Sequence, residues 1–145
     1  MSFPEPRPGL VIRYSYLWEH EAREGREEGV KDRPCAIVLV LLREGGHPIV
    51  RVLPVTHSAP ADPADALEIP QATKRRLGLD SEPSWVMLNE ANDFIWPGPD
   101  LRPAVNGDPS SIAYGMLPPG FWTVLRDRLV ARWRERQPKV TRRTE

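Results

Sequence analysis

Cysteine, histidine and paired carboxylates are the side chains that most often hold metals or carry out catalysis, and few stand at a recognisable spacing here. The one cysteine, Cys35, lies in the apolar run 35–42 and has no partner for a disulfide. No CxxC pair, His/Cys cluster or paired carboxylate has the spacing of a metal site. We therefore expect Cys35 to be a small buried hydrophobe, and we expect no metal or other cofactor.

Cations are the other group that could act on a ligand, and they are unevenly placed. The 145 residues carry 20 Lys+Arg and 20 Asp+Glu, so the formal net charge is zero. Glutamates crowd residues 19–28, whereas arginines crowd 126–143, with a shorter basic run at 74–76. A neutral total can hide a basic face that meets nucleic acid, although a charge run more often marks the solvent side of a helix.

Short extended segments must position these side chains, because the 17 prolines disfavour long helices. Residues 12–18 alternate like a half-buried strand, and 34–42 form the apolar run of a central strand. Gly45-Gly46-His47-Pro48 predicts a hairpin turn into a third strand, 49–56. Further short strands are expected at 67–69, 85–88 and 94–96. Loops are expected at 19–32, where Gly25 opposes a helical turn, and at 58–66.

Helical patterns occur in two places. Pro70 and Gly78 bracket one or two helical turns. A longer helix opens at Pro118-Pro119 and ends at Pro138, with one apolar stripe at Phe121, Leu125, Leu129 and Trp133. We expect the core or an interface to hold Trp85, Trp96, Trp122 and Trp133. Five or six strands with one closing helix predict a mainly β fold, a small barrel with a docked helix.

The length suits a single domain with one core. We expect an N-terminal extension at 1–8, a barrel domain at 9–137 and a frayed basic tail at 138–145. The N-terminus lacks the features of a secretory leader, and the run 35–42 is far shorter than the roughly 20 residues that span a bilayer. The sequence therefore predicts a cytoplasmic protein that does not enter the membrane.

Four segments, in this order, resemble the MazF/PemK family of toxins. Gly9-Leu10-Val11-Ile12 resembles the family's opening strand, and Lys31-Asp32-Arg33-Pro34 with the apolar run after it resembles the Arg-Pro motif. Leu53-Pro54-Val55-Thr56 with Ser58 resembles the end of the third strand. Residues 89–96 resemble the segment that begins with Asp-Gln in the family and ends in tryptophan. A proline-initiated amphipathic helix then closes the chain, as in the family.

The resemblance implies an SH3-like β-barrel that forms a homodimer. Many members cleave single-stranded RNA without a metal, leaving a cyclic phosphate and a 5′-hydroxyl, and a cognate antitoxin protein normally inhibits them. Operator DNA, bound together with the antitoxin, is a further expected partner. The implied function is the toxin of a type II toxin–antitoxin system, an endoribonuclease that inhibits growth.

The same resemblance places the catalytic pair at Arg33 and Thr56. A planar guanidinium fits phosphate oxygens and would stabilise the charge that builds during cleavage, with acid catalysis as a second role. Thr56 would position the phosphate or the 2′-hydroxyl. His57 adjoins it, and histidine is a common acid–base catalyst. Neighbouring strand residues point to opposite faces, however, so we expect His57 to face away from the groove.

Contacts with RNA are expected around this pair. Lys31 lies two residues before Arg33 and suits a phosphate, and Ser58 returns to the face of Thr56 if the strand continues. An aromatic ring such as Trp18 can stack on any base. The remaining expected contacts are Glu90, Lys74 and Arg75.

Three positions depart from the family pattern and keep other functions open. Leu10 replaces an acidic residue, Asn89-Glu90 stands where Asp-Gln is typical, and Asn92 stands where a cation is common. Glu90 and the acidic loop before Arg33 oppose phosphate, and Asn92 removes a cation near the expected groove. The alternative is a non-catalytic member of the fold that binds nucleic acid or inhibits a protein such as DNA gyrase. The gyrase poison CcdB ends in Trp-Gly-Ile, whereas this chain ends in Thr141-Arg142-Arg143-Thr144-Glu145.

Overall fold

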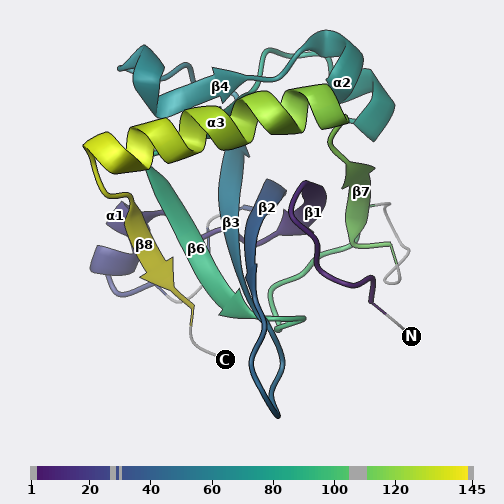
Figure 1. Ribbon diagram of the computed structural model, residues 1–145, viewed down its shortest axis with the longest axis vertical. Helices are drawn as coiled ribbons and strands as arrows, with labels where there is room; N and C mark the ends of the chain where they lie inside the picture. Colours follow the sequence, from purple (N-terminus) through teal and green to yellow (C-terminus); the bar gives the residue numbers. More distant parts are fainter. Residues whose placement is uncertain (1–2, 27–28, 30, 105–110, 144–145) are drawn as a thin grey trace.

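The computed structural model describes residues 3–26, 29, 31–104 and 111–143. Within these residues the strands are β1 (Leu10–Tyr14), β2 (Arg33–Leu41), β3 (Ile49–Thr56), β4 (Ala66–Glu68), β5 (Trp85–Met87), β6 (Glu90–Ile95), β7 (Ala113–Met116) and β8 (Lys139–Arg142). The helices are α1 (Glu19–Arg23), α2 (Gln71–Leu77) and α3 (Pro119–Glu135), and a 3-10 turn spans Pro63–Asp65. Figure 1 shows α3 crossing one end of the strands, with the β2–β3 hairpin projecting from the other.

Strand β3 organises the sheet. It pairs with β2 over most of its length, with β6 through residues 49–52 and with β5 through its last two residues. The order is β4-β5-β3-β2-β1-β7, with β6 and β8 branching from β3. The pairs are antiparallel apart from β6–β8. The mainly β architecture with helices is as predicted, but the described strands leave the sheet open, so a closed barrel stays a prediction.

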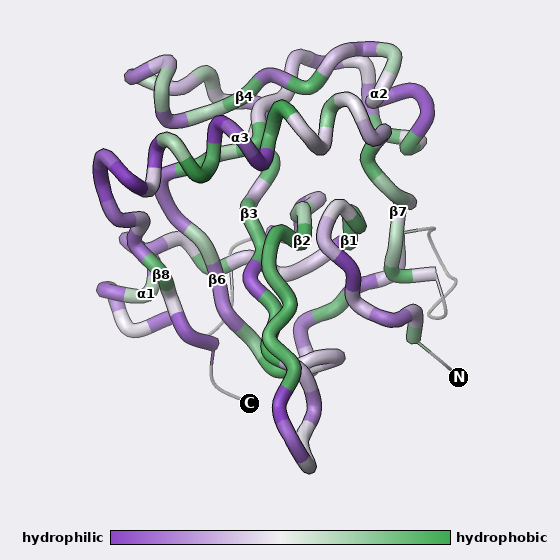
Figure 2. The backbone as a smooth tube through the Cα atoms, in the orientation of Figure 1, coloured by the Kyte–Doolittle hydropathy of each residue, from purple (hydrophilic) through white to green (hydrophobic). Residues whose placement is uncertain are grey.

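Each face of the sheet carries a buried apolar cluster, and successive strand residues contribute to opposite clusters because they point to opposite sides. One cluster packs against α3 and includes Val11, Ala36, Leu53, Leu125 and Leu129. The cluster on the other face includes Ile12, Cys35, Ile37, Val52 and Phe94. This two-sided burial explains the apolar residues 35–37 of β2, whereas Leu39 and Leu41 further along the strand are exposed. Figure 2 shows β2 as a hydrophobic stretch beside β3. Cys35 is fully buried, as predicted, and burial raises the pKa of its thiol.

The helix predictions are confirmed. Leu125 and Leu129 of α3 are buried, and Phe121 and Trp133 pack against the same cluster. The indole nitrogen of Trp133 also donates to the backbone oxygen of Leu88 at 2.8 Å. Helix α2 ends at Gly78, whose φ of 72° lies in the left-handed region that glycine adopts without strain.

Several element boundaries differ from the prediction. Strand β1 covers residues 10–14 rather than 12–18, because after Tyr14 the chain leaves β2 and the Ser15 nitrogen donates to Asp100 instead. Helix α1 forms inside the expected loop 19–32 and ends just before Gly25. Strand β7 was not predicted, since four residues that include Gly115 carry little strand pattern.

The frayed tail expected at 138–145 is wrong for residues 139–143. Strand β8 pairs in parallel with β6, and the Arg143 side chain is 1% exposed. Its guanidinium donates to the Ser15 backbone oxygen at 2.6 Å and to Asp100 Oδ2 at 2.9 Å. The basic end of the chain is therefore anchored in the sheet, while residues 144–145 lie outside the described residues.

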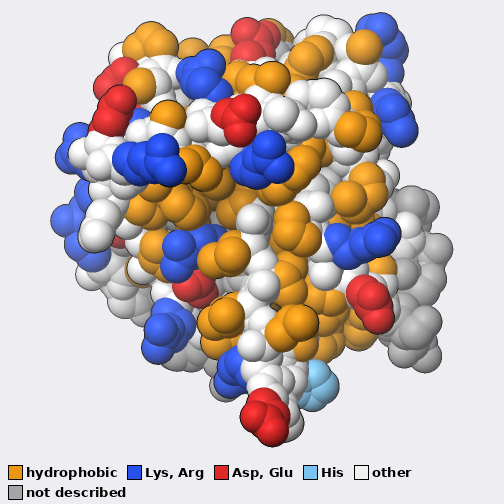
Figure 3. All heavy atoms as spheres, in the orientation of Figure 1, with side chains coloured by type: hydrophobic (Ala, Val, Ile, Leu, Met, Phe, Trp, Pro, Cys, Tyr) orange, Lys and Arg blue, Asp and Glu red, His pale blue; other side chains and the backbone are white. Residues whose placement is uncertain are grey.

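The surface carries apolar side chains along the hairpin side of the sheet. Leu39, Leu41 and Leu42 are 47%, 56% and 80% exposed. Figure 3 shows hydrophobic side chains spread over the strands below α3, with Lys and Arg along the helix itself. Among the helices of the described residues, none combines the length and apolar character needed to cross a membrane.

Candidate functional site

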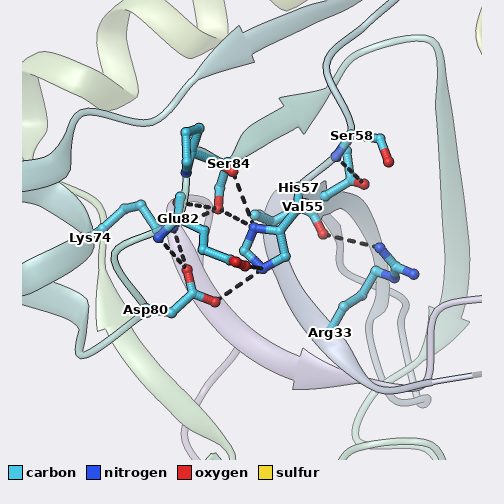
Figure 4. Close-up of polar contacts among 10 residues, drawn as sticks. Arg33, Val55, His57, Ser58, Lys74, Asp80, Glu82 and Ser84 are labelled. Atoms are coloured by element: carbon cyan, nitrogen blue, oxygen red, sulfur yellow. Dashed lines mark hydrogen bonds and ion pairs between the residues drawn. The ribbon is translucent and has the colours of Figure 1, made fainter.

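Arg33 begins β2 and holds its guanidinium against β3. Its Nη1 donates to the backbone oxygen of Val55 at 3.3 Å (Figure 4), and the Trp18 ring lies over it, with the Arg33 Cζ 4.9 Å from the ring centroid. The Nε is buried and has no hydrogen-bond partner among the described residues. Burial lowers the pKa of Arg33, and nearby acidic groups that include Glu21 and Glu90 oppose that shift. Because the Nε is closed to solvent, an anion in the cavity would meet the Nη atoms, whose one hydrogen bond among the described residues is the bond to Val55.

A cavity of about 370 Å³ brings Arg33 together with three more of the predicted residues, Lys31, Thr56 and Lys74. Lys31 is exposed at its rim, and Thr56 is half-buried. The other charged or titratable lining residues are Arg13, Asp32, His57, Asp80 and Tyr114. Arg33, Lys31 and a hydroxyl around one hollow suit an oxyanion such as a phosphate.

Thr56 reaches the cavity because it is the last residue of β3. It pairs with Trp85 of β5, and its Oγ1 accepts a hydrogen bond from the Ser58 nitrogen at 3.2 Å. The hydroxyl hydrogen remains to donate to a ligand. Ser58 itself is exposed and does not line the cavity, so in this arrangement it supports Thr56 through its backbone.

Lys74 differs from the prediction. Its side chain is 1% exposed rather than on a solvated helix face. The ammonium donates to Asp80 Oδ1 at 2.7 Å, to Ser84 Oγ at 2.6 Å and to the backbone oxygen of Glu82. Three acceptors match the three N–H bonds of an ammonium, so Lys74 has no donor left for RNA. Arg75, the next residue of α2, is exposed and lies outside the cavity lining.

His57 was expected to face away from Thr56, and this expectation is wrong. The strand ends at Thr56, so the alternation of faces stops there and both side chains line the cavity. Figure 4 shows the His57 ring between Ser84 and two carboxylates. Its Nε2 lies 3.0 Å from Asp80 Oδ2 and 3.6 Å from Glu82 Oε2. The sequence carried no signal for this cluster, because the carboxylates follow α2 and reach His57 only through the fold.

Trp18 and Glu90 lie near Arg33 without joining it at the cavity lining. Trp18 is half-buried, with one ring face against Arg33 and an edge contact to Tyr16 at 5.2 Å between centroids. Glu90 accepts hydrogen bonds from the Tyr16 hydroxyl at 2.9 Å and the Glu19 nitrogen at 3.2 Å. Burial raises the pKa of Glu90. It borders a second cavity, of about 300 Å³, rather than the Arg33 cavity.

Asn92 was expected near the groove, and its position is instead structural. It is fully buried in β6 and exchanges two hydrogen bonds with the Leu17 backbone, at 2.9 Å to the nitrogen and 2.8 Å to the oxygen. Arg143 also donates to its side-chain oxygen at 3.2 Å. The missing cation at this position therefore removes nothing from the Arg33 cavity.

Comparison with known proteins adds no assignment to this site. No protein-family model matches the chain, and no protein of curated function matches it.

Proposed function

We propose that this chain is a ribonuclease toxin of the MazF/PemK type, which cleaves single-stranded RNA without a metal. The observation that carries the proposal is the half-buried Arg33 guanidinium, which lines one cavity with Lys31 and Thr56 and donates from its Nη atoms to Val55 alone among the described residues. An unsatisfied donor on a half-buried cation suits a phosphate better than a neutral ligand. The ordered sequence motifs around Arg33 and Thr56 support the same reading independently of the cavity.

The proposed reaction is attack by the ribose 2′-oxygen on the adjacent phosphorus. The bond to the 5′-oxygen breaks, which leaves a 2′,3′-cyclic phosphate and a 5′-hydroxyl. Negative charge builds on the phosphate oxygens, and Arg33 stabilises it through charge-assisted hydrogen bonds. Thr56 orients the phosphate or the attacking hydroxyl, and Lys31 at the rim binds the backbone of the RNA.

A toxin of this type implies three partners: a second copy of the chain, an antitoxin protein and operator DNA. A homodimer is supported by the exposed leucines of β2 and the turn after it, Leu39, Leu41 and Leu42, which offer apolar surface for self-association. A cognate antitoxin protein would cover the cationic cavity, and the pair would bind operator DNA. The proposed place of action is the cytoplasm, where single-stranded RNA is the substrate.

The test is cleavage of single-stranded RNA in EDTA, with both ends of the products mapped. We expect 5′-hydroxyl products from the wild type, a loss of at least roughly 100-fold for Arg33→Ala and a smaller loss for the near-isosteric Thr56→Val. Arg128→Ala on the exposed side of α3 is the matched control and should cleave at the wild-type rate. Circular dichroism melting confirms that each variant folds. Intact RNA after incubation with folded wild-type protein refutes the proposal.

A second function is favoured by the carboxylates at the same cavity. Asp32 and Asp80 line it beside Arg33, and the Trp18 ring covers part of the guanidinium. These features weaken the hold of Arg33 on a scissile phosphate. They therefore favour a protein without cleavage activity, which binds nucleic acid through other surface groups or inhibits a protein target such as DNA gyrase. Salt-dependent RNA binding without products identifies the first of these, and inhibition of gyrase supercoiling identifies the second.

A further inference from the structure

The cluster of His57, Asp80 and Glu82 has no task in the proposed RNA cleavage. His57 follows β3 directly, and the two carboxylates lie in the segment between α2 and β5. One ligand atom from each of the three residues lies within 4.8 Å of the others, and all three residues are exposed. His57 and Asp80 also line the Arg33 cavity. An imidazole with two carboxylates is a common donor set for divalent transition metals.

The orientation of the His57 ring is that of a metal ligand. Its Nδ1 lies 3.1 Å from the backbone oxygen of Pro83, and 3.2 Å from Ser84 Oγ. A carbonyl oxygen only accepts hydrogen bonds, so Nδ1 carries a hydrogen and the Nε2 is the atom that faces the carboxylates. Histidines that bind metals through one nitrogen usually donate from the other to a carbonyl or carboxylate in this way.

Hydrogen bonds also orient the Asp80 carboxylate as they orient carboxylates that bind metals. Its Oδ1 accepts from the buried Lys74 ammonium at 2.7 Å and from the Glu82 nitrogen at 3.2 Å, which leaves Oδ2 pointing to His57. Lys74 is fixed in turn by Ser84 at 2.6 Å. These outer contacts orient the donor oxygen before any ligand arrives.

Two of the three distances between the donor atoms fit a shared cation, and the third, between the Asp80 and Glu82 oxygens, lies within 4.8 Å. Bonds of about 2.0–2.2 Å to one ion hold neighbouring ligand atoms about 3.0–3.6 Å apart in octahedral or tetrahedral geometry. The Nε2 of His57 lies 3.0 Å from Asp80 Oδ2 and 3.6 Å from Glu82 Oε2. We propose that His57, Asp80 and Glu82 bind a divalent transition-metal ion of the Zn²⁺ class, with water in the remaining coordination positions.

The ion would change the charge of the cavity without entering the cleavage reaction. His57 and Asp80 line the same hollow as Arg33, so a bound cation neutralises carboxylates that otherwise oppose a phosphate. It would also tie the segment that follows α2 to the end of β3. Metal binding is measured on the protein alone, so its failure is distinguishable from failure of RNA cleavage, which is assayed in EDTA.

The test is calorimetric titration of untagged, chelator-stripped full chain with ZnCl₂. We expect one Zn²⁺ per chain, and at least about tenfold weaker binding in His57→Ala and in Glu82→Gln. His47→Ala is the matched control, because His47 is exposed in the β2–β3 turn, and it should bind like the wild type. Melting curves without metal confirm that all four proteins fold.

Two outcomes overturn the proposal. One is absence of Zn²⁺ binding by folded wild type, in which case the cluster only holds His57 against its two carboxylates. The other is binding that persists unchanged in both His57→Ala and Glu82→Gln, which places the ion elsewhere on the chain.

Discussion

Replacing Arg143 with methionine should destabilise this protein far more than replacing its neighbour Arg142 with methionine. The Arg143 side chain is 1% exposed, and its partner Asp100 is 10% exposed. Methionine matches the aliphatic part of the arginine side chain and keeps the backbone bond from the residue 143 nitrogen to Asp93, at 2.9 Å. The substitution therefore removes the guanidinium while the strand pairing of β8 remains possible.

The expected loss follows from what the guanidinium leaves behind. Removing one partner of a buried ion pair costs about 3–5 kcal/mol, because the other charge stays buried without compensation. Arg102 also faces Asp100, at 3.8 Å and with 29% of its side chain exposed, and keeps part of that compensation. The loss should therefore lie near the lower limit, at about 3 kcal/mol. With a slope of about 2 kcal/mol per molar urea, the unfolding midpoint should fall by about 1.5 M.

The assay is equilibrium unfolding in urea, followed by the fluorescence of the 5 tryptophans. Arg142→Met is the control, because Arg142 is exposed on β8 and should change stability by less than about 0.5 kcal/mol. Adding Asp100→Asn to Arg143→Met should restore part of the loss, since the amide is easier to bury than the charge. Equal midpoints for Arg143→Met and Arg142→Met would refute the reasoning and would indicate that residues 138–143 form a frayed tail.

Two further predictions concern buried charge elsewhere. Lys74→Met should lower the free energy of unfolding by about 1–3 kcal/mol and speed amide exchange at residues 80–84. The reason is that Ser84 and the Glu82 backbone oxygen lose their donor, whereas the exposed Asp80 is solvated by water instead. The control is Arg75→Met at the exposed neighbouring position, which should have neither effect. Burial raises the folded-state pKa of Glu90 above 4.5, so its contribution to stability is present below pH 4.5 and is lost as the pH rises through the folded value. Thermal melts of Glu90→Gln should therefore depend less on pH than wild type from pH 4.5 upwards, and an unchanged pH profile contradicts this.

Local patterns in the sequence were sufficient for much of the scaffold. The stripe of Leu125 and Leu129 predicted α3 and its buried side, because helical spacing alone puts these residues on one face. The turn at Gly45-Gly46 predicted the β2–β3 hairpin, and Gly78 predicted the end of α2. Arg33 and Thr56, chosen by motif, lie at one cavity because they sit at adjoining ends of paired strands.

Only the tertiary structure decided which charged residues are buried and which acceptors they contact. From the sequence, Arg143 and Lys74 resemble solvated cations. A run of charges has the same local pattern whether its side chains face solvent or buried hydrogen-bond acceptors. Their acceptors come from distant segments: Asp100 lies 43 positions from Arg143, and Ser84 lies 10 positions from Lys74. The cluster of His57 with Asp80 and Glu82 arises in the same way, from a strand end meeting the segment after α2. Periodicity reports which face of an element is apolar, whereas charge pairing depends on distances that exist only after the chain has folded.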